Sequence, residues 1–260
     1  RPDSISVISI NAATGHAVNI GLPRNLQHVG FVAGSPMLKV YPNGWNCGNE
    51  CLINAIYKDV TDNHADLYPD AVKHGSTPGV EATRDAVAYV TGLKIQSYVI
   101  VDMAAFSSLI DALGGIDINV KQRLPIGGQR DDLSDVKGWI EEGQQHMNGY
   151  TALWYARSRH NTNDYDRMRR QHEVEEQVLQ QMDPANVLSR VQQIMSAGEQ
   201  LVETDIPSGM LFEYKNLAGK AKAYGIKSLG ITPPKYDPQY PNFKKIRADI
   251  QAAFDAEAKN

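Results

Sequence analysis

The order of hydrophobic and polar positions predicts strands and helices that alternate along the whole chain. Residues 3–10 and 17–22 have the β-branched composition of two strands, and the residues between them include the Asn and Gly of a turn. Strands are also predicted for three later segments, residues 95–101, 116–120 and 226–231. Because strands and helices interleave and no linker-like stretch divides them, we expect one α/β domain over residues 1–260, with a central mixed sheet flanked by helices.

Helices are predicted where hydrophobic residues recur at every third or fourth position. One such segment has Thr77 as its N-cap, Pro78 at its first helical position and Gly92 at its end. Other helices are expected at residues 104–115, 164–182, from 183 onwards, 209–225 and 241–254. Two segments rich in glycine and polar residues contain no predicted element, residues 30–50 and 127–138.

Composition narrows the class of protein without identifying it. With 42% hydrophobic and 22% charged residues, the chain is typical of a soluble globular protein. The net charge of -4 argues against a general nucleic-acid binder, so any anion site must be local. No run of 18 apolar residues could span a membrane. Because the chain begins at Arg1 rather than Met and lacks a signal peptide, we interpret it as a fragment or processed form.

The two cysteines, Cys47 and Cys51, lie in the loop-like segment YPNGWNCGNEC. Two thiols cannot complete a structural zinc site, and the CxxxC spacing differs from the CxxC of redox motifs. The spacing is compatible with two free thiols or, if the segment is not helical, with a local disulfide. We predict the disulfide, which would stabilise the fold by roughly 2 kcal/mol and favour an extracytoplasmic location.

Five arginines are concentrated between residues 155 and 170 of this acidic chain, at Arg157, Arg159, Arg167, Arg169 and Arg170. On a strand, Arg157 and Arg159 would point to the same face, because alternate residues share a face. On the helix predicted to follow, Arg167 and Gln171 share a face at positions i and i+4. Guanidinium groups bind phosphate through two parallel hydrogen bonds, so convergence of these pairs indicates a ligand with several negative charges, such as a pyrophosphate.

A solvated, salt-bridged surface is the alternative interpretation of the same arginines. Glu173, Glu175 and Glu176 follow closely and could pair with Arg169 and Arg170. This alternative explains those two arginines better than it explains the alternating pair.

The arginine segment resembles the signature of the LytR–CpsA–Psr family, in which an RxRH stretch is followed by DxxRxxRQ. The matching positions are Arg157, Arg159, His160, Asp164, Arg167, Arg170 and Gln171. Four other segments resemble the family in the same order: RPDSISVISINAATGHAVNIGLPRN, CLINAIY, TGLKIQSYVIVDMAAFSSLIDALGGIDINV and EEGQQHMNGYTALWYARSRH. The core motifs therefore lie within residues 1–182, and residues 183–260 would complete the domain.

The resemblance implies an enzyme that acts on the outer face of the cytoplasmic membrane, tethered by an N-terminal transmembrane helix that this chain does not include. Members of the family transfer a glycopolymer, with its proximal phosphate, from a polyprenyl-pyrophosphate carrier to peptidoglycan, with the assistance of Mg²⁺. The apolar tail of the carrier would lie in a hydrophobic pocket between the sheet and its helices. A pyrophosphatase side activity would be compatible with this chemistry.

Individual residues take their expected roles from the same resemblance. Asp3 would hold Mg²⁺, and the catalytic residues would be Asp3, Arg24, Arg157 and Arg159. The pyrophosphate would be bound by six side chains, those of Arg1, Arg24, Arg157, Arg159, Arg167 and Gln171. These residue types suit phosphoryl transfer, which depends on positioning and on neutralising the charge of the phosphate oxygens.

Two departures from the family pattern concern the metal and the base. The family has another aspartate in a strand upstream of its RxD motif, and this chain begins after that position. The PRD motif reads Pro23-Arg24-Asn25 here, and an asparagine cannot act as a carboxylate base.

Three functions are compatible with these observations, and we predict the first, a glycopolymer phosphotransferase. The second is a non-catalytic binder or sensor of polyprenyl-pyrophosphate lipids. The third is nucleic-acid binding, against which the net charge and the lack of an aromatic-basic stripe both argue. The cysteine pair and the segment ITPPKYDPQYPNF resemble the actinobacterial branch of the family, which implies arabinogalactan as the cargo.

Overall fold

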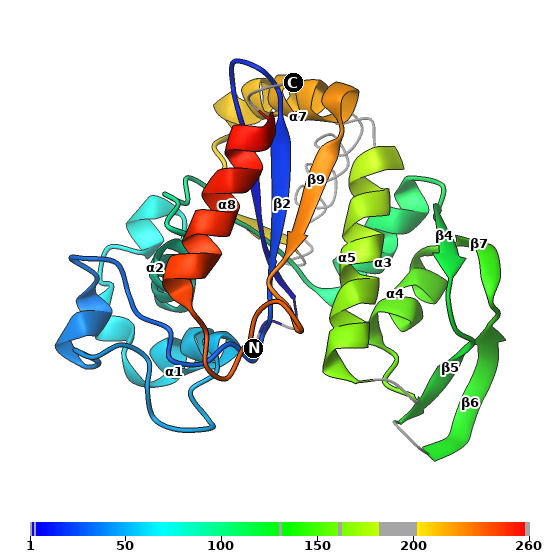
Figure 1. Cartoon of the computed structure of the whole chain (residues 1–260), viewed down its shortest axis with the longest axis horizontal. Coiled ribbons are helices and arrows are strands. Elements are labelled where there is room, and N and C mark those ends of the chain that lie inside the picture. The colour runs from blue at the N-terminus through cyan, green and yellow to red at the C-terminus, as the bar shows by residue number, and fades with distance from the viewer. Residues whose placement is uncertain (1, 3, 130–131, 161–162, 182–201, 258–260) are drawn as a thin grey trace.

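A mixed three-stranded sheet lies at the centre of the computed structural model, which describes the chain except residues 1, 3, 130–131, 161–162, 182–201 and 258–260 (Figure 1). In this sheet β1 (Ile5–Ile10) pairs antiparallel with β2 (Ala17–Leu22), and β2 pairs parallel with β9 (Ile226–Gly230). The α/β class and the mixed sheet expected from the sequence are therefore confirmed.

Helices lie on both sides of the sheet, with α1, α2 and α8 on one side and α5 on the other, and α3 and α4 lie beyond α5 (Figure 1). Their bounds are α1 (Ile56–Asn63), α2 (Pro78–Thr91), α3 (Met103–Ala112), α4 (Gly149–Arg157), α5 (Asp164–Gln181), α7 (Leu211–Tyr224) and α8 (Phe243–Glu257). Short 3₁₀ turns are η1 (Pro36–Lys39), η2 (Ile53–Ala55), η3 (Ala65–Leu67), η4 (Val72–His74) and η5 (Ser208–Met210). Within the described part of the chain, no helix has the length and apolarity needed to cross a bilayer.

The remaining strands form two-stranded ribbons. They pair as β3 (Val99–Val101) with β8 (Val202–Thr204), β4 (Ile116–Val120) with β7 (Gly143–Met147), and β5 (Leu124–Gln129) with β6 (Asp132–Ile140). The strand predicted at residues 95–101 is therefore shorter than expected. The prediction that residues 127–138 contain no strand or helix is wrong, because β5 and β6 extend into this segment. Gly127 and Gly128 have positive φ angles of 90° and 74° beside the register shifts of a bulged hairpin. The two glycines, which suggested a loop in the sequence, instead permit a β-bulge within the hairpin.

Most predicted helices are confirmed, with their ends. Thr77, Pro78 and Gly92 take the predicted positions at the ends of α2, and Gly92 ends the helix at φ 73°. In α8 the side chains of Ile246 and Ile250 are buried, as their spacing predicted. The helix expected from residue 183 onwards begins outside the described residues, and α4 was not predicted.

Buried hydrophobic residues form two clusters. The sheet cluster joins one face of β2 to α1, α2 and α8 through residues that include Val18, Ile20, Ile56, Val90 and Ile246. The hairpin cluster joins α3, α4 and α5 to the β4–β7 and β5–β6 ribbons through residues that include Ile110, Ile118, Leu124, Tyr155 and Val174. The helix α5 lies between the central sheet and the hairpin cluster (Figure 1).

Candidate functional site

Three segments that the sequence analysis singled out meet at the end of β2. The backbone N–H of Asn54 donates to the carbonyl oxygen of Arg24 over 3.3 Å, and its side-chain Nδ2 donates to the carbonyl oxygen of Pro2 over 3.2 Å. These bonds join the opening motif, the Pro-Arg-Asn turn and the segment CLINAIY. Arg1 and Asp3 lie outside the described residues, although both are chain neighbours of Pro2.

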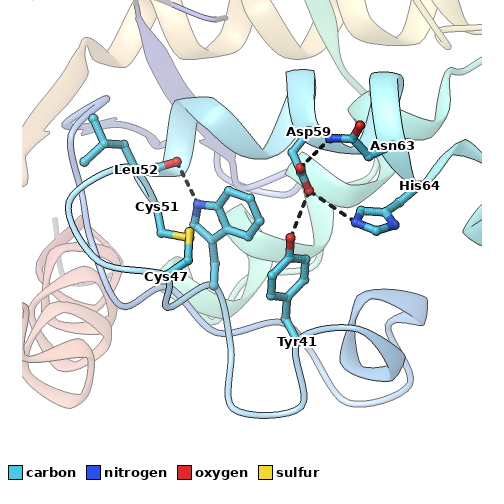
Figure 2. Close-up of a disulfide and its surroundings, with 8 residues drawn as sticks. Tyr41, Cys47, Cys51, Leu52, Asp59, Asn63 and His64 are labelled. Atoms are coloured by element: carbon cyan, nitrogen blue, oxygen red, sulfur yellow. Dashed lines mark hydrogen bonds and ion pairs between the residues drawn. A yellow bond between two sulfur atoms is a disulfide. The ribbon is translucent and has the colours of Figure 1, made fainter.

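A disulfide fixes the loop that leads into Asn54. Cys47 and Cys51 are bonded, with Cα atoms 5.2 Å apart, which confirms the predicted pairing (Figure 2). Trp45 Nε1 donates to the carbonyl oxygen of Leu52 over 3.0 Å, so the loop is closed on both sides of the disulfide. Because Asn54 follows Leu52 by two residues, the disulfide restrains the position of the Asn54 side chain.

Hydrogen bonds to Asp59 connect the preceding loop to α1 (Figure 2). Its carboxylate accepts from Tyr41 Oη over 3.2 Å and from Asn63 Nδ2 over 2.9 Å. The Tyr41 ring also meets the Trp45 ring edge-on, with centroids 4.8 Å apart. The loop is therefore packed against the sheet cluster rather than projecting from it.

The arginine pair does not lie on a strand, so that prediction is wrong. Arg157 is the last residue of α4, and Arg159 follows in the loop before α5. Asn148 caps α4 by accepting from Thr151 N–H over 2.9 Å, a start signal that the sequence contained. Since the two arginines are in different backbone conformations, they do not share a strand face. Arg157 is exposed above the Trp154 ring, whereas Arg159 is half-buried.

Two α5 side chains hold the C-terminal end of α4. Arg170 donates to the carbonyl oxygen of Tyr155 over 2.8 Å and to that of Ser158. Gln171 Nε2 donates to the carbonyl oxygen of Ala156 over 3.4 Å. The last carbonyls of a helix lack partners within the helix, so these donors fasten α4 to α5 and position the loop that carries Arg159.

The salt-bridged surface is confirmed for Arg169, whereas Arg170 is buried and does not belong to a solvated surface. Arg169 is exposed and lies 3.4 Å from Asp166 and 3.7 Å from Glu173, which makes it a surface ion-pair residue. Arg170 is only 3% exposed and contacts backbone carbonyls. Burial lowers the pKa of its guanidinium, because desolvation disfavours the charged form.

The helix α5 lies against the small-residue face of β2. A Cβ atom at Gly21 would lie 1.4 Å from Nε2 of His172, so only glycine permits this approach. The N-terminal end of α5 and the C-terminal end of β2 lie on the same side of the molecule (Figure 1). Arg167, five residues before His172, and Arg24, three residues after Gly21, are therefore carried to the same end of this interface.

The predicted arginines differ in their exposure to solvent. Arg24 follows β2 by two residues, Arg159 lies in the loop before α5, and Arg167 lies in the first turn of α5, so all three belong to segments at the C-terminal end of β2 or the N-terminal end of α5. Arg24 and Arg159 are half-buried and Arg167 is 3% exposed, so protein surrounds all three. The exposed Arg157 lies at the outer side of α4.

Two buried amide oxygens are side-chain atoms near the end of β2 whose chemistry suits a cation. The described residues contain no group of three His, Cys, Asp or Glu side chains that could hold a metal ion. At the end of β2, however, Oδ1 of Asn25 and Oδ1 of Asn54 are buried and lack hydrogen-bond partners. Both atoms are of the oxygen type that Mg²⁺ takes as a ligand, so the residues present fit this ion. The sequence analysis did not assign a role to Asn54, although its INA segment contained the signal.

A cavity of about 550 Å³ is lined by residues of α2, of the segment that follows α2, and of α8. Its lining includes Arg84, Asp85, Tyr89 and Arg247, and none of the predicted site residues. Arg84 pairs with Asp205 over 2.8 Å, and Arg247 donates to the carbonyl oxygen of Tyr89 over 2.7 Å. These cations are engaged in joining α2 to its neighbours, so we assign the cavity no ligand.

Known structures share this architecture. The crystal structure of Bacillus subtilis TagV superposes with a TM-score of 0.65 at 23% identity, covering 98% of this chain and 90% of that one. TagT bound to LIIa-WTA also gives a TM-score of 0.65, at 16% identity, covering 97% of this chain and 85% of that one. At such identities the likeness defines the fold alone.

The family is established by sequence. The model of the LytR_cpsA_psr family matches residues 1–249, and the chain belongs to this family. Among curated relatives, the polyisoprenyl-teichoic acid–peptidoglycan teichoic acid transferase TagV of Bacillus subtilis (strain 168) is 23% identical over 268 residues. The match includes 98% of this chain and 60% of the relative, so the chain spans well under two thirds of that protein's length.

Proposed function

We propose that the protein transfers a glycopolymer, with its proximal phosphate, from a polyprenyl-pyrophosphate carrier to peptidoglycan. The observation that supports the proposal is that the C-terminal end of β2, which precedes Arg24, and the N-terminal end of α5, which carries Arg167 and follows Arg159, lie on the same side of a molecule of net charge -4 (Figure 1). Membership of the family and the name of its relative TagV support the same reaction class.

The arginines would bind and neutralise the pyrophosphate. Planar guanidinium groups donate to phosphate oxygens in pairs, and protein around them strengthens that attraction by excluding water. Arg24 and Arg159 would contact the reacting phosphates, and Arg167 would hold the diphosphate from the helix side. Arg157 would act at the outer rim of the site. Gln171 would contribute by fixing the end of α4 and therefore the loop that carries Arg159.

Asp3 would be the carboxylate ligand of Mg²⁺, with Asn oxygens at the end of β2 beside it. When bound, the ion would neutralise charge on the phosphate oxygens. Asn25 cannot take a proton from the acceptor hydroxyl, because an amide has no basic form at ordinary pH. Its amide would instead orient groups by hydrogen bonding or coordination.

The ribbon strand β3 is suited to the apolar carrier tail. Val99, Ile100, Val101 and Met103 are each between 36% and 51% exposed, although all four are apolar. Val99 and Val101, as alternate residues of a strand, share one face, and exposed apolar side chains grouped in this way often mark a lipid or protein contact. We propose that the polyprenyl chain covers these side chains, in the pocket expected between sheet and helices.

The location and the cargo follow from the same proposal. The disulfide between Cys47 and Cys51 suits an oxidising compartment outside the cytoplasm. The protein would act at the outer face of the membrane, anchored by a segment upstream of residue 1. We propose arabinogalactan as the glycopolymer, on the resemblance to the actinobacterial branch.

The proposal is tested by transfer of a radiolabelled glycan from a synthetic polyprenyl-pyrophosphate donor to peptidoglycan fragments. We expect Arg159→Ala to lower the rate about 100- to 1000-fold, as loss of one transition-state donor does. Arg169→Ala is the matched control, because it removes an equally charged residue of the same segment that pairs only at the surface. Its rate should equal that of the wild type.

The same assay distinguishes the transferase from the alternative function, a non-catalytic lipid sensor. Mass spectrometry of lipid that copurifies with the protein would detect a polyprenyl pyrophosphate in either case. Binding without transfer would establish the sensor. Phosphate release without an acceptor would measure the pyrophosphatase side activity. Full transfer by the Arg159→Ala variant would remove this arginine from the mechanism.

A further inference from the structure

We infer that Asn54 is a ligand of the divalent cation, through its side-chain carbonyl oxygen. The inference rests on the proposed function for the presence of Mg²⁺, and it adds a residue that the family motifs did not assign. Three observations carry it: the burial of Asn54, the fixed orientation of its amide, and the unpaired state of its oxygen.

The amide of Asn54 has one orientation. Its Nδ2 lies 3.2 Å from the carbonyl oxygen of Pro2, and the residue is 5% exposed. A flipped amide would place two oxygen atoms, both acceptors, at that distance, which is unfavourable. The nitrogen therefore faces the opening motif through Pro2, and Oδ1 faces away from Pro2 with no donor in reach.

An unpaired oxygen at this depth needs a partner. Leaving a buried acceptor unsatisfied costs about 1–3 kcal/mol, so native structures rarely retain one without a reason. The flanking residues Ile53 and Ala55 are buried in the sheet cluster, which keeps bulk water away. The sequence nevertheless places asparagine here, and the disulfide loop and two hydrogen bonds hold it rigidly.

A cation satisfies this geometry better than a neutral donor. Asn54 bonds to the carbonyls of Pro2 and Arg24, so it lies between Pro2 and the turn that contains Asn25. Asn25 Oδ1 is a second buried oxygen without a partner at the same turn. Hard cations bind oxygen ligands, and an asparagine oxygen holds one Mg²⁺ in protein kinases.

The test is Mn²⁺ binding, measured by electron paramagnetic resonance on the full 260-residue chain with and without inorganic pyrophosphate. We expect Asn54→Ala to weaken Mn²⁺ binding about tenfold, which is about 1.4 kcal/mol. Asn54→Asp adds a charge to the ligand oxygen, so it should bind Mn²⁺ more tightly than the wild type, although its second oxygen replaces the donor to Pro2 and should lower the melting temperature of the metal-free protein. The added charge should also make its affinity fall as pH decreases.

Asn19→Ala is the matched control. Asn19 is as buried as Asn54, and both of its polar side-chain atoms lack partners, but it lies in the middle of β2. Its replacement should leave Mn²⁺ affinity unchanged. If Asn54→Ala fails to fold, the Asn54→Asp variant and the Mn²⁺-dependent rise of its melting temperature decide the question.

Two outcomes would overturn the inference. Equal Mn²⁺ affinity in the wild type and Asn54→Asp would show that this oxygen does not face the ion. Undetectable Mn²⁺ binding by the wild type would remove the site altogether. Neither result refutes the proposed transferase, whose rate is measured separately with the lipid-linked donor. Conversely, a protein that binds Mn²⁺ through Asn54 but transfers no glycan would retain this inference and lose the proposed function.

Discussion

The sheet cluster and the hairpin cluster differ in the contacts at their edges: apolar side chains and a disulfide in the first, buried hydrogen bonds in the second. In the sheet cluster, α8 covers the core with Ile246 and Ile250, and the Cys47–Cys51 disulfide closes the adjoining loop. In the hairpin cluster, the core ends in polar groups that are themselves buried. The fully buried Tyr155 donates its hydroxyl to Glu173, and Arg170 donates to backbone carbonyls.

This difference matters because the hydrogen-bonded edge of the hairpin cluster also fixes the position of the loop that carries Arg159. Apolar contacts tolerate small shifts, whereas hydrogen bonds to carbonyls require defined distances and angles. The buried hydrogen bonds of Tyr155 and Arg170 lie where α4 ends and the loop that carries Arg159 begins. Burial, with the hydrogen bond to Glu173, raises the pKa of Tyr155 well above its usual value, so it remains a neutral donor.

The largest expected effect tests whether the two clusters unfold together. Ile246→Ala removes a fully buried side chain from the sheet cluster and should lower the free energy of unfolding by about 2–5 kcal/mol. Because α5 packs against both the central sheet and the hairpin cluster, we expect one transition in urea. Fluorescence of Trp45 reports on the sheet cluster, and that of Trp154 reports on the hairpin cluster.

The control for this comparison is Val174→Ala in the hairpin cluster, which should cost about 2 kcal/mol. Single-tryptophan versions of both variants should give coincident transitions. Separate midpoints for Trp45 and Trp154 would show instead that the clusters are independent units.

A smaller effect is expected from the buried hydrogen bonds of Arg170. Arg170→Ala leaves the carbonyls of Tyr155 and Ser158 without this donor, and it should lower the free energy of unfolding by about 3 kcal/mol. Arg169→Ala, one residue away but exposed, should change it by less than about 0.5 kcal/mol. Chemical denaturation of both variants measures the difference. Similar values for the two would place Arg170 at the surface and remove the contrast between the clusters.

The disulfide should contribute less to the free energy of unfolding than Arg170 does. Replacing both Cys47 and Cys51 by serine should cost about 2 kcal/mol, since the closed loop is short. The melting temperature of the double variant, compared with that of the wild type without reductant, measures this. Under the metal-site inference, Mn²⁺ affinity should fall as well, because the loop restrains Asn54. An unchanged melting temperature would show that Trp45 and Asp59 alone hold the loop.

The smallest effect concerns pH in the β4–β7 ribbon. The hydrogen bond to Asp117, and then that to the Gly114 carbonyl, raise the pKa of the exposed His146. A raised pKa in the folded state means stability that is present below about pH 6.5 and lost as pH rises through the folded value. The melting temperature of the wild type should exceed that of His146→Gln at about pH 5.5. The difference should vanish at about pH 8.5, and a constant difference would exclude titration as its cause.

Periodicity and end signals predicted much of the fold. The Thr77–Pro78 start and Gly92 end of α2, and the spacing of Ile246 and Ile250 in α8, are local features that tertiary contacts did not alter. The pairing of Cys47 with Cys51 was also predictable, because the loop-like composition around them left few other roles.

The errors arose where tertiary contacts decide the structure. The alternation of Arg157 and Arg159 has the period of a strand, yet Asn148 starts a helix whose buried face is Ala152, Tyr155 and Ala156. Arg170 has glutamates nearby in sequence, but α4 supplies carbonyl partners that a linear pattern cannot reveal. The convergence of Arg24 with Arg167 depends on the packing of α5 against β2, which no local signal specifies.

The glycine at position 21 sets how closely α5 approaches β2. Real Cβ contacts are essentially never below 3.0 Å, so a methyl group lying 1.4 Å from the His172 ring would force α5 or the ring away from β2. Arg24 follows β2 and Arg167 belongs to α5, so a displacement of α5 from β2 would change the separation of the two segments that carry these arginines. If the proposed function holds, Gly21 would influence the length of phosphate chain that these arginines can bind together.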